Sequence, residues 1–323
     1  MGYDRAKAIA YAEKHWNVPC DDGKFGLTND RPSVASKRME LHAPAADGWK
    51  PEFVKGSGEP EKFVFRRTTP AGVEEKIISN WAGLADCAHF LSQCLSAGGA
   101  TTNEWGVAGL VQNLQSRSDT KTLCERVAQA AAQRVINSGV FKQGDMIGYF
   151  NVDPDGDYGG RPSYTHSTMF AGKPTATDDG RVTCHTVARF PGKTWAGVED
   201  RWWLHSGYTY TLIHFVSDDS TPNLTRAAAL EGWWMLEYSG RTEYYYIFRD
   251  GRARYTKRAP KSAREQLAVA DGGAYWFMDA GGKITFVWRA TGTLEVWTPS
   301  PPDMTSYRSL INGATPGVVT KLF

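Results

Sequence analysis

The last third of the chain is a series of short strand-like segments, and this series restricts the possible folds more than any other feature. Tight turns separate the segments, among them Asp250-Gly251, Gly281-Gly282 and Thr291-Gly292. Six such segments within about 75 residues are typical of a small antiparallel barrel or a strongly curled sheet. The expected strands are Gly232–Tyr238, Glu243–Arg249, Arg252–Lys257, Gly273–Met278, Lys283–Trp288 and Thr293–Thr298.

Aromatic residues are frequent in these strands. The chain of 323 residues has 12 tryptophans, and Trp233, Trp276, Trp288 and Trp297 fall in the expected strands. Large aromatic side chains suit a half-buried pleated surface, so we expect them in the barrel core or on a strand face. The alternative is an aromatic surface that binds a glycan or a partner protein.

The earlier part of the chain has helices first and strands afterwards. Apolar residues at helical spacing predict helices over 4–16, 86–99, 103–116 and 121–137. Strands are expected over 144–150, 163–171, 181–188 and 208–216, with one isolated strand over 62–67. This order predicts an α+β domain. Because residues 217–221 are polar and turn-forming, we expect a first domain over 1–216, a linker over 217–221 and an all-β domain over 222–323.

Composition excludes several classes of function. The net charge is +2, and no cluster of Lys and Arg is dense enough to predict a nucleic-acid partner. No apolar run is long enough for a membrane span, and the first residues lack a classical signal peptide, so synthesis in the cytoplasm is expected. The five cysteines, at positions 20, 87, 94, 124 and 184, form neither a metal-type pair nor a disulfide framework. No metal and no cofactor are expected.

One of these cysteines has an unusual place. Cys87 lies where the helix over 86–99 begins, and there the unpaired backbone N–H groups and the helix dipole favour a negative charge. A thiol in that place has a lowered pKa and is a better nucleophile near neutral pH. A cysteine on an apolar helix face is ordinarily an inert core residue, and that is what we expect of Cys94 on the same helix.

Two histidines on neighbouring expected strands complete a candidate catalytic group. His166 lies in the strand over 163–171, and His185 lies 19 residues later in the next strand. Adjacent antiparallel strands can place two side chains on one face. The hypothesis is that Cys87 attacks, that His166 transfers the proton, and that His185 orients His166 through a ring-nitrogen hydrogen bond. Asp86 is expected to cap the helix, and His89 to lie at the surface or the rim of the site.

These residues also match a known family. The stretch Asp86-Cys87-Ala88-His89-Phe90-Leu91-Ser92-Gln93-Cys94-Leu95-Ser96-Ala97-Gly98-Gly99 resembles the helix of the putative amidase domain family, which is related to the NlpC-type papain-like cysteine peptidases. Gly144-Asp145-Met146-Ile147, the His166 strand, Cys184-His185-Thr186 and the opening residues 3–12 are similar to further elements of that family, in the same order. His89 in place of Asn, Ser167-Thr168-Met169 in place of small apolar residues, and an insertion over 151–162 are departures.

The resemblance covers residues 3–216 and implies a papain-like (NlpC-type) fold that hydrolyses amide bonds through a thioester, with bacterial cell-wall peptidoglycan peptides as the expected substrate. Without a signal peptide, such an enzyme would reach the periplasm or cell wall by dedicated export, for example as an antibacterial effector with an immunity or carrier protein as partner. Two alternatives stay open: a protein deamidase or acyl transferase with the same Cys-His site, and a binding protein without turnover.

Overall fold

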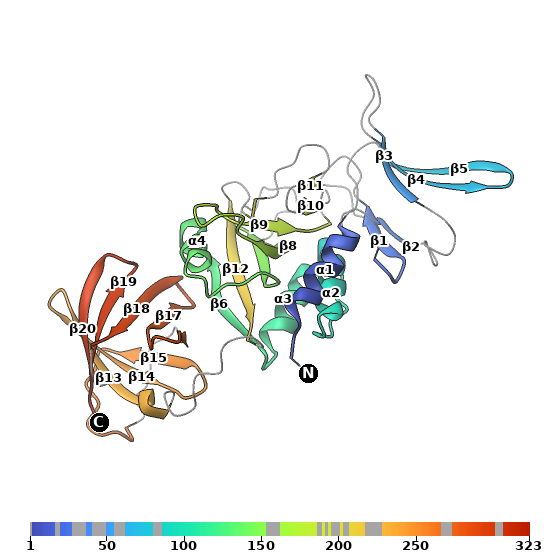
Figure 1. Cartoon of the computed structure of the whole chain (residues 1–323). Helices are drawn as coiled ribbons and strands as arrows, with labels where there is room; N and C mark the ends of the chain where they lie inside the picture. The colour runs from blue at the N-terminus through green and yellow to red at the C-terminus, as the bar shows by residue number, and fades with distance from the viewer. Residues whose placement is uncertain are drawn as a thin grey trace. The chain divides into compact units, whose positions relative to one another are not determined.

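The structure is a computed structural model. It describes residues 2–16, 20–27, 37–40, 50–54, 62–79, 86–152, 162–185, 189–190, 193–194, 201–202, 207–216, 228–265, 273–300 and 306–323. The chain forms two compact units, a first one of residues 1–117 and 142–209 and a second one of residues 118–141 and 210–323. In chain order, a mixed α/β region is followed by an eight-stranded antiparallel β-barrel (Figure 1).

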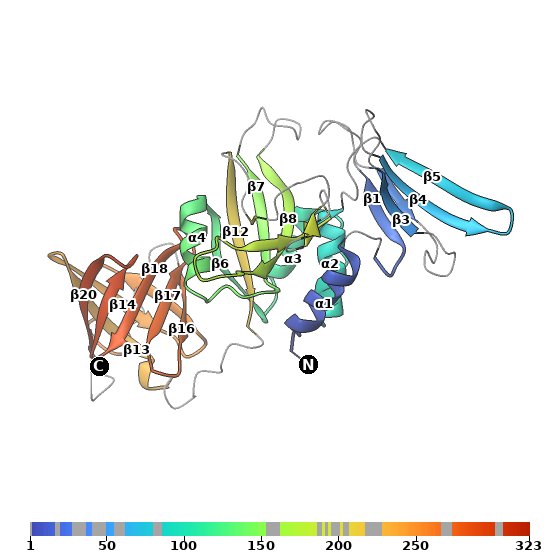
Figure 2. The ribbon, with the colours of Figure 1, turned by 45° about the horizontal axis from the view of Figure 1, so that its top comes forward.

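Three helices belong to the first unit: α1 (Arg5–His15), α2 (Cys87–Ala97) and α3 (Val107–Gln115). All three confirm helices that the sequence predicts. The helices α1 and α2 lie side by side (Figure 2). The Asp4 N–H donates to the Gly98 carbonyl at 2.7 Å, and a Cβ on Gly98 would lie 2.8 Å from the Asp4 carbonyl oxygen. Glycine at position 98 therefore allows the close approach of α1 to the end of α2.

The sheet strands that α2 and α3 pack against are also in the first unit. They are β7 (Met146–Asn151), β8 (Ser163–Gly172) and β9 (Arg181–Thr183), paired antiparallel in that order. Both helices contact β8. The expected strand over 181–188 ends early: β9 stops at Thr183, and His185 is in a turn. Residues 186–188 lie outside the described residues.

Small sheets account for the remaining strands of the first unit. They are β1 (Lys24–Leu27) with β2 (Lys37–Glu40), β3 (Lys50–Val54) with β4 (Lys62–Thr69) and β5 (Gly72–Ser79), and β10 (Arg189–Phe190) with β11 (Lys193–Thr194). Of the five strands between residues 24 and 79, the sequence predicted only β4.

The predicted helix over 121–137 is wrong in its first half. The structure has strand β6 (Thr120–Val127) followed by helix α4 (Gln129–Asn137). Strand β6 pairs antiparallel with β12 (Tyr208–Phe215), for example Cys124 with Leu212. Thr120, Thr122 and Val127 are β-branched, and the ladder to a distant strand satisfies backbone groups that a local helix would otherwise pair.

The barrel closes because β13 pairs with β20 as well as with β14. Its strands are β13 (Gly232–Tyr238), β14 (Arg241–Ile247), β15 (Arg252–Thr256), β16 (Ala274–Met278), β17 (Ile284–Trp288), β18 (Thr293–Pro299), β19 (Ser306–Ile311) and β20 (Thr315–Lys321). The six expected strands are present, and β19 and β20 are additional. The buried core cluster of the barrel contains four tryptophans: Trp234, Trp276, Trp288 and Trp297. Trp233 is not part of this cluster and packs against Tyr246.

Two further expectations concern regions that the structure does not describe fully. The expected linker over 217–221 lies outside the described residues, and so does most of the expected insertion, residues 153–161. The domain boundary therefore stays a prediction. Within the described ranges, no helix has the length and apolar character needed to cross a membrane.

Candidate active site

Cys87 is the first residue of α2 and is half-buried. The other four cysteines, Cys20, Cys94, Cys124 and Cys184, are all buried. Burial raises the pKa of the Cys94 thiol on the same helix. Cys87 thus differs from Cys94 in two ways: it lies at the helix N-terminus, a position that favours a thiolate, and it is only partly buried.

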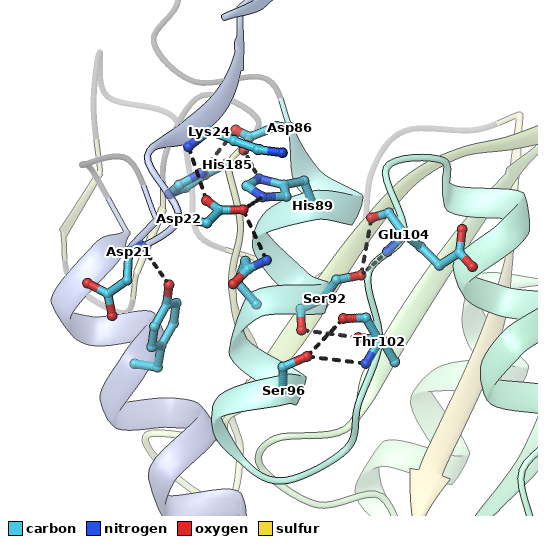
Figure 3. Close-up of polar contacts among 12 residues, drawn as sticks. Asp21, Asp22, Lys24, Asp86, His89, Ser92, Ser96, Thr102, Glu104 and His185 are labelled. Atoms are coloured by element: carbon cyan, nitrogen blue, oxygen red, sulfur yellow. Dashed lines mark hydrogen bonds and ion pairs between the residues drawn. The ribbon is translucent and has the colours of Figure 1, made fainter. Parts of the chain in front are cut away.

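A buried carboxylate lies directly before Cys87 and contacts two imidazole rings. Asp86 Oδ2 is 2.8 Å from His89 Nδ1, and Asp86 Oδ1 is 3.0 Å from His185 Nδ1. Nε2 of His89 lies 2.9 Å from Asp22 Oδ2 (Figure 3). Nε2 of His185 donates to the His15 carbonyl at 2.6 Å. We call this chain of groups, Asp22–His89–Asp86–His185, the Asp-His network.

The charges of the Asp-His network follow from its hydrogen bonds. Each of the four ring nitrogens faces an oxygen that accepts: a carboxylate oxygen in three cases and a backbone carbonyl in the fourth. All four nitrogens therefore carry protons if both carboxyl groups are ionised, and each ring is then an imidazolium. Two cations and two anions give no net charge. Paired in this way, the charges can remain buried beside the helix.

The pKa shifts of Asp86 and His89 agree with this assignment. Burial raises the pKa of the Asp86 carboxyl, but the imidazoles of His185 and His89 outweigh it and hold that pKa below its usual 3.8. Burial lowers the pKa of His89, but the carboxylates of Asp86 and Asp22 outweigh it and raise that pKa above its usual 6.5. Asp86 is 5% exposed and His89 0%, so these interactions are little screened by water.

Aromatic rings fix the two imidazoles. The His89 ring stacks on Trp105 with centroids 4.0 Å apart, and the His185 ring stacks on Phe90 at 3.9 Å. The Asp86 N–H also donates to the His185 carbonyl at 3.0 Å. Asp86 directly precedes Cys87, and Phe90 is in the first turn of α2. His185 is therefore held against the start of α2 by a ring contact, a side-chain hydrogen bond and a backbone hydrogen bond.

Two expectations for this region are wrong. Asp86 makes no side-chain cap bond to α2, because both carboxylate oxygens accept from imidazoles instead. His89 is not a surface or rim residue, because it is fully buried between Asp86, Asp22 and Trp105. The sequence signal that could have found this role is the spacing of Asp86 and His89, which puts both on one side of a helix.

The role expected of His185 also needs correction. Both of its ring nitrogens are hydrogen bonded, one to Asp86 and the other to the His15 carbonyl. Neither is left to orient His166. Within the structure, His185 instead joins the end of β9 to the start of α2 and to the last residue of α1. It is suited to position the helix that carries Cys87.

His166 lies in β8, the strand that α2 packs against, and is 6% exposed. Its strand partner is Tyr149, whose ring centroid lies 4.8 Å from the His166 ring, and the Tyr149 hydroxyl is 3.0 Å from Thr168 Oγ1. His166 thus shares a strand face with Tyr149 and Thr168. A Cβ on the neighbouring Gly148 would lie 3.1 Å from Val111 Cγ2 of α3. A contact between Cys87 and His166 stays a prediction.

A metal site was not expected. Among the residues that the structure describes, no group of three or more His, Cys, Asp and Glu side chains could hold a metal ion. In the Asp-His network both ring nitrogens of His89 lie at hydrogen-bond distance from carboxylate oxygens, so neither nitrogen has a lone pair for a metal ion.

A family model described as "Putative amidase domain" matches residues 2–212. No curated protein and no solved structure matches the chain.

Proposed function

The chain belongs to the putative amidase domain family, and on that premise we propose that it is a cysteine hydrolase of amide bonds with Cys87 as nucleophile. The observation that carries the proposal is the place of Cys87: it is half-buried at the first position of α2, whereas the other four cysteines are buried. A nucleophile must reach its substrate and must be ionised, and this position favours both.

The chemistry requires one nucleophile and one base. The Cys87 thiolate attacks the amide carbonyl carbon, and the backbone N–H groups at the start of α2 stabilise the oxyanion. The C–N bond then breaks, the protonated base gives its proton to the leaving amine, and a thioester remains on Cys87. Water, deprotonated by the same base, attacks the thioester and releases the carboxylic acid and the free thiol.

We assign the base to His166 by comparing the histidines that the structure describes in the first unit, His15, His89, His166 and His185. Both ring nitrogens of His89 and of His185 are already hydrogen bonded, to Asp86, Asp22 or the His15 carbonyl. The His15 ring lies against Tyr11 and Asp21. His166 remains, and it is on β8, the strand that contacts the helix of Cys87.

The Asp-His network supports the thiolate in a second way. An ionised carboxylate next to Cys87 would oppose a negative charge on sulfur. Asp86 accepts from two imidazoles, whose positive charges offset its own at hydrogen-bond distance. The field of the helix N-terminus at Cys87 is then not opposed by an unpaired carboxylate.

For the substrate we propose peptidoglycan peptides, because the family resemblance implies them. The test is digestion of purified peptidoglycan by the wild type and by Cys87→Ala, with product masses measured. Cys94→Ala is the matched control, since Cys94 lies on the same helix but is buried. The proposal predicts new amine and carboxyl termini with the wild type and the control, and none with Cys87→Ala.

The same variants separate the alternatives. Ammonia released from protein glutamine or asparagine, with peptidoglycan unchanged, would show a protein deamidase. Transfer of an acyl group to an added amine would show an acyl transferase. If Cys87→Ala matches the wild type in every assay, the hydrolase proposal is wrong and a binding protein is the better interpretation.

A further inference from the structure

The barrel has a partly open cavity of about 240 Å³ that the proposed hydrolysis does not use. Three tyrosines, one tryptophan and two glutamates form part of its wall: Tyr238, Glu243, Tyr245, Tyr255, Trp288 and Glu295. They come from the five strands β13, β14, β15, β17 and β18 of the second unit. An eight-stranded barrel is wide enough inside either for packed side chains or for one small ligand.

Glu295 breaks the apolar pattern of the barrel interior. It is 1% exposed and lies between Thr293 and Trp297 on the inward face of β18. Its Oε1 accepts from Trp297 Nε1 at 2.5 Å and from the Ser309 hydroxyl at 3.0 Å. Burial raises the pKa of the Glu295 carboxyl despite these hydrogen bonds. Tyr245 and Trp288 also hydrogen bond with Glu295, but among the residues that the structure describes no Lys or Arg forms an ion pair with it. A buried carboxylate without a cation is costly, so a cationic ligand in the cavity would stabilise it.

The second carboxylate fixes the direction of the hydrogen bonds. Glu243 accepts from the Tyr238 hydroxyl at 2.9 Å and from the Tyr245 hydroxyl at 3.1 Å. The phenol proton of Tyr238 therefore points to Glu243, and that of Tyr245 is held by Glu243 and Glu295, so the tyrosine oxygens offer a ligand only their accepting lone pairs. Apart from the Thr291 and Thr293 hydroxyls, the polar groups of the cavity wall thus mainly accept hydrogen bonds. A ligand that fits it donates them.

Aromatic rings supply the rest of the wall. Trp288 lies 5.2 Å from Tyr255 at an interplanar angle of 86° and 5.5 Å from Tyr245 at 59°. Rings tilted in this way can present π-faces to a shared space, and a π-face attracts a cation.

Burial and the Glu243 carboxylate raise the pKa of the Tyr238 hydroxyl, and the basic residue that opposes them is Arg241.

We propose that this cavity binds an organic ammonium group, such as the side chain of a lysine residue, with its cation between the aromatic rings and Glu295. The three N–H donors of an ammonium match a wall of acceptors, and its charge matches Glu295 and Glu243. A neutral sugar can donate its hydroxyl hydrogen bonds to the same carboxylates, but it carries no charge to pair with them, so it fits less well than an ammonium group. The inference concerns the second unit and does not depend on the chemistry at Cys87.

The test is isothermal titration calorimetry on the full chain carrying Cys87→Ala, which removes the proposed nucleophile. The probes are Nα-acetyl-lysine methylamide, its uncharged analogue Nα-acetyl-norleucine methylamide, and N-acetylglucosamine. The lysine probe should bind, and the norleucine probe should bind at least about tenfold more weakly or not at all. Equal binding of the two, or binding of the sugar alone, would overturn the proposal.

Glu295→Gln is the decisive variant. A glutamine oxygen can still accept from Trp297 and Ser309, so the barrel should fold, while the charge is removed. Affinity for the lysine probe should fall about tenfold or more, whereas Glu231→Gln, which changes an exposed carboxylate paired with Arg249, should have no effect. If Glu295→Gln does not fold, Glu243→Gln tests the same wall. Unchanged affinity in the folded variant contradicts the inference.

Discussion

The Oδ1 atom of Asp86 lies 3.0 Å from Nδ1 of His185, a residue 99 positions later in the chain. This contact joins the start of α2 to the end of β9 in the first unit. Since the Asp86 N–H also donates to the His185 carbonyl, the residue before Cys87 is fixed through both its backbone and its side chain. The place of the proposed nucleophile thus depends on a buried pair of opposite charges.

The first prediction follows from this pair. Asp86→Asn should lower the free energy of unfolding by about 3–5 kcal/mol, because it leaves buried imidazoles without their anion. Asp22→Asn should cost less, because the Asp22 side chain is 29% exposed and contacts one imidazole, whereas that of Asp86 is 1% exposed and contacts two. Urea denaturation of both variants measures the difference. Equal losses of unfolding free energy in the two variants would contradict the central place of Asp86 in the Asp-His network.

The second prediction is a pH dependence of stability. The folded-state pKa of His89 is raised, so its stabilising contribution is complete below its usual pKa of 6.5 and is lost as the pH rises through the folded-state value. The pKa of Asp86 is lowered, so its contribution is present above 3.8 and is lost as the pH falls through the folded-state value. The melting temperature should therefore fall above pH 6.5, and His89→Gln should flatten that decline. An unchanged slope would contradict the assignment.

The third prediction concerns thiol reactivity. In the folded protein, iodoacetamide should modify Cys87 and spare the other cysteines, because they are buried and burial raises the pKa of Cys20, Cys94 and Cys124. Peptide mapping by mass spectrometry identifies the modified residue. If His166 pairs with the thiolate, His166→Gln should shift the rate profile of Cys87 alkylation to higher pH. A profile identical to that of the wild type would exclude His166 as the base.

The fourth prediction concerns the hydrogen bonds between Ser92 of α2 and the backbone of Glu104. The Ser92 hydroxyl donates to the Glu104 carbonyl at 3.1 Å and accepts from the Glu104 N–H at 3.1 Å (Figure 3). Ser92→Ala should cost about 1–3 kcal/mol, because it leaves both backbone groups without that partner. Ser116→Ala removes an exposed hydroxyl and should cost less than about 0.5 kcal/mol. Similar losses in thermal or urea unfolding would rule out this role for Ser92.

Local patterns were sufficient where neighbours in sequence are neighbours in space. Helices α1, α2 and α3 follow from apolar spacing, and six barrel strands follow from hairpin turns. Strands β19 and β20 were missed, and in β20 Pro316 and Gly317 weaken the strand pattern. Gly317 is explained by packing: a Cβ there would lie 2.7 Å from Leu236 Cδ1 of β13, the strand that closes the barrel.

The Asp-His network shows the limit of the sequence. Asp22 lies 67 positions before His89, and His185 lies 99 positions after Asp86, so no periodicity relates them. From the local sequence, Asp86 was expected to cap the helix and His89 to lie at the surface. The structure differs because both side chains form contacts with residues distant in the sequence. Strand β6 was missed for the same reason, because its partner β12 is distant in the chain.

The central claim is that Cys87 attacks an amide carbonyl carbon, and the acyl-enzyme tests it most directly. Wild type is mixed with peptidoglycan peptides, quenched in acid within the first turnover, and measured by intact-protein and peptide mass spectrometry. The account predicts a thioester adduct on the peptide that contains Cys87, with the amine product released in equal amount, and no adduct with Cys87→Ala. Release of the amine by Cys87→Ala at the wild-type rate, or an adduct on another residue, would contradict it.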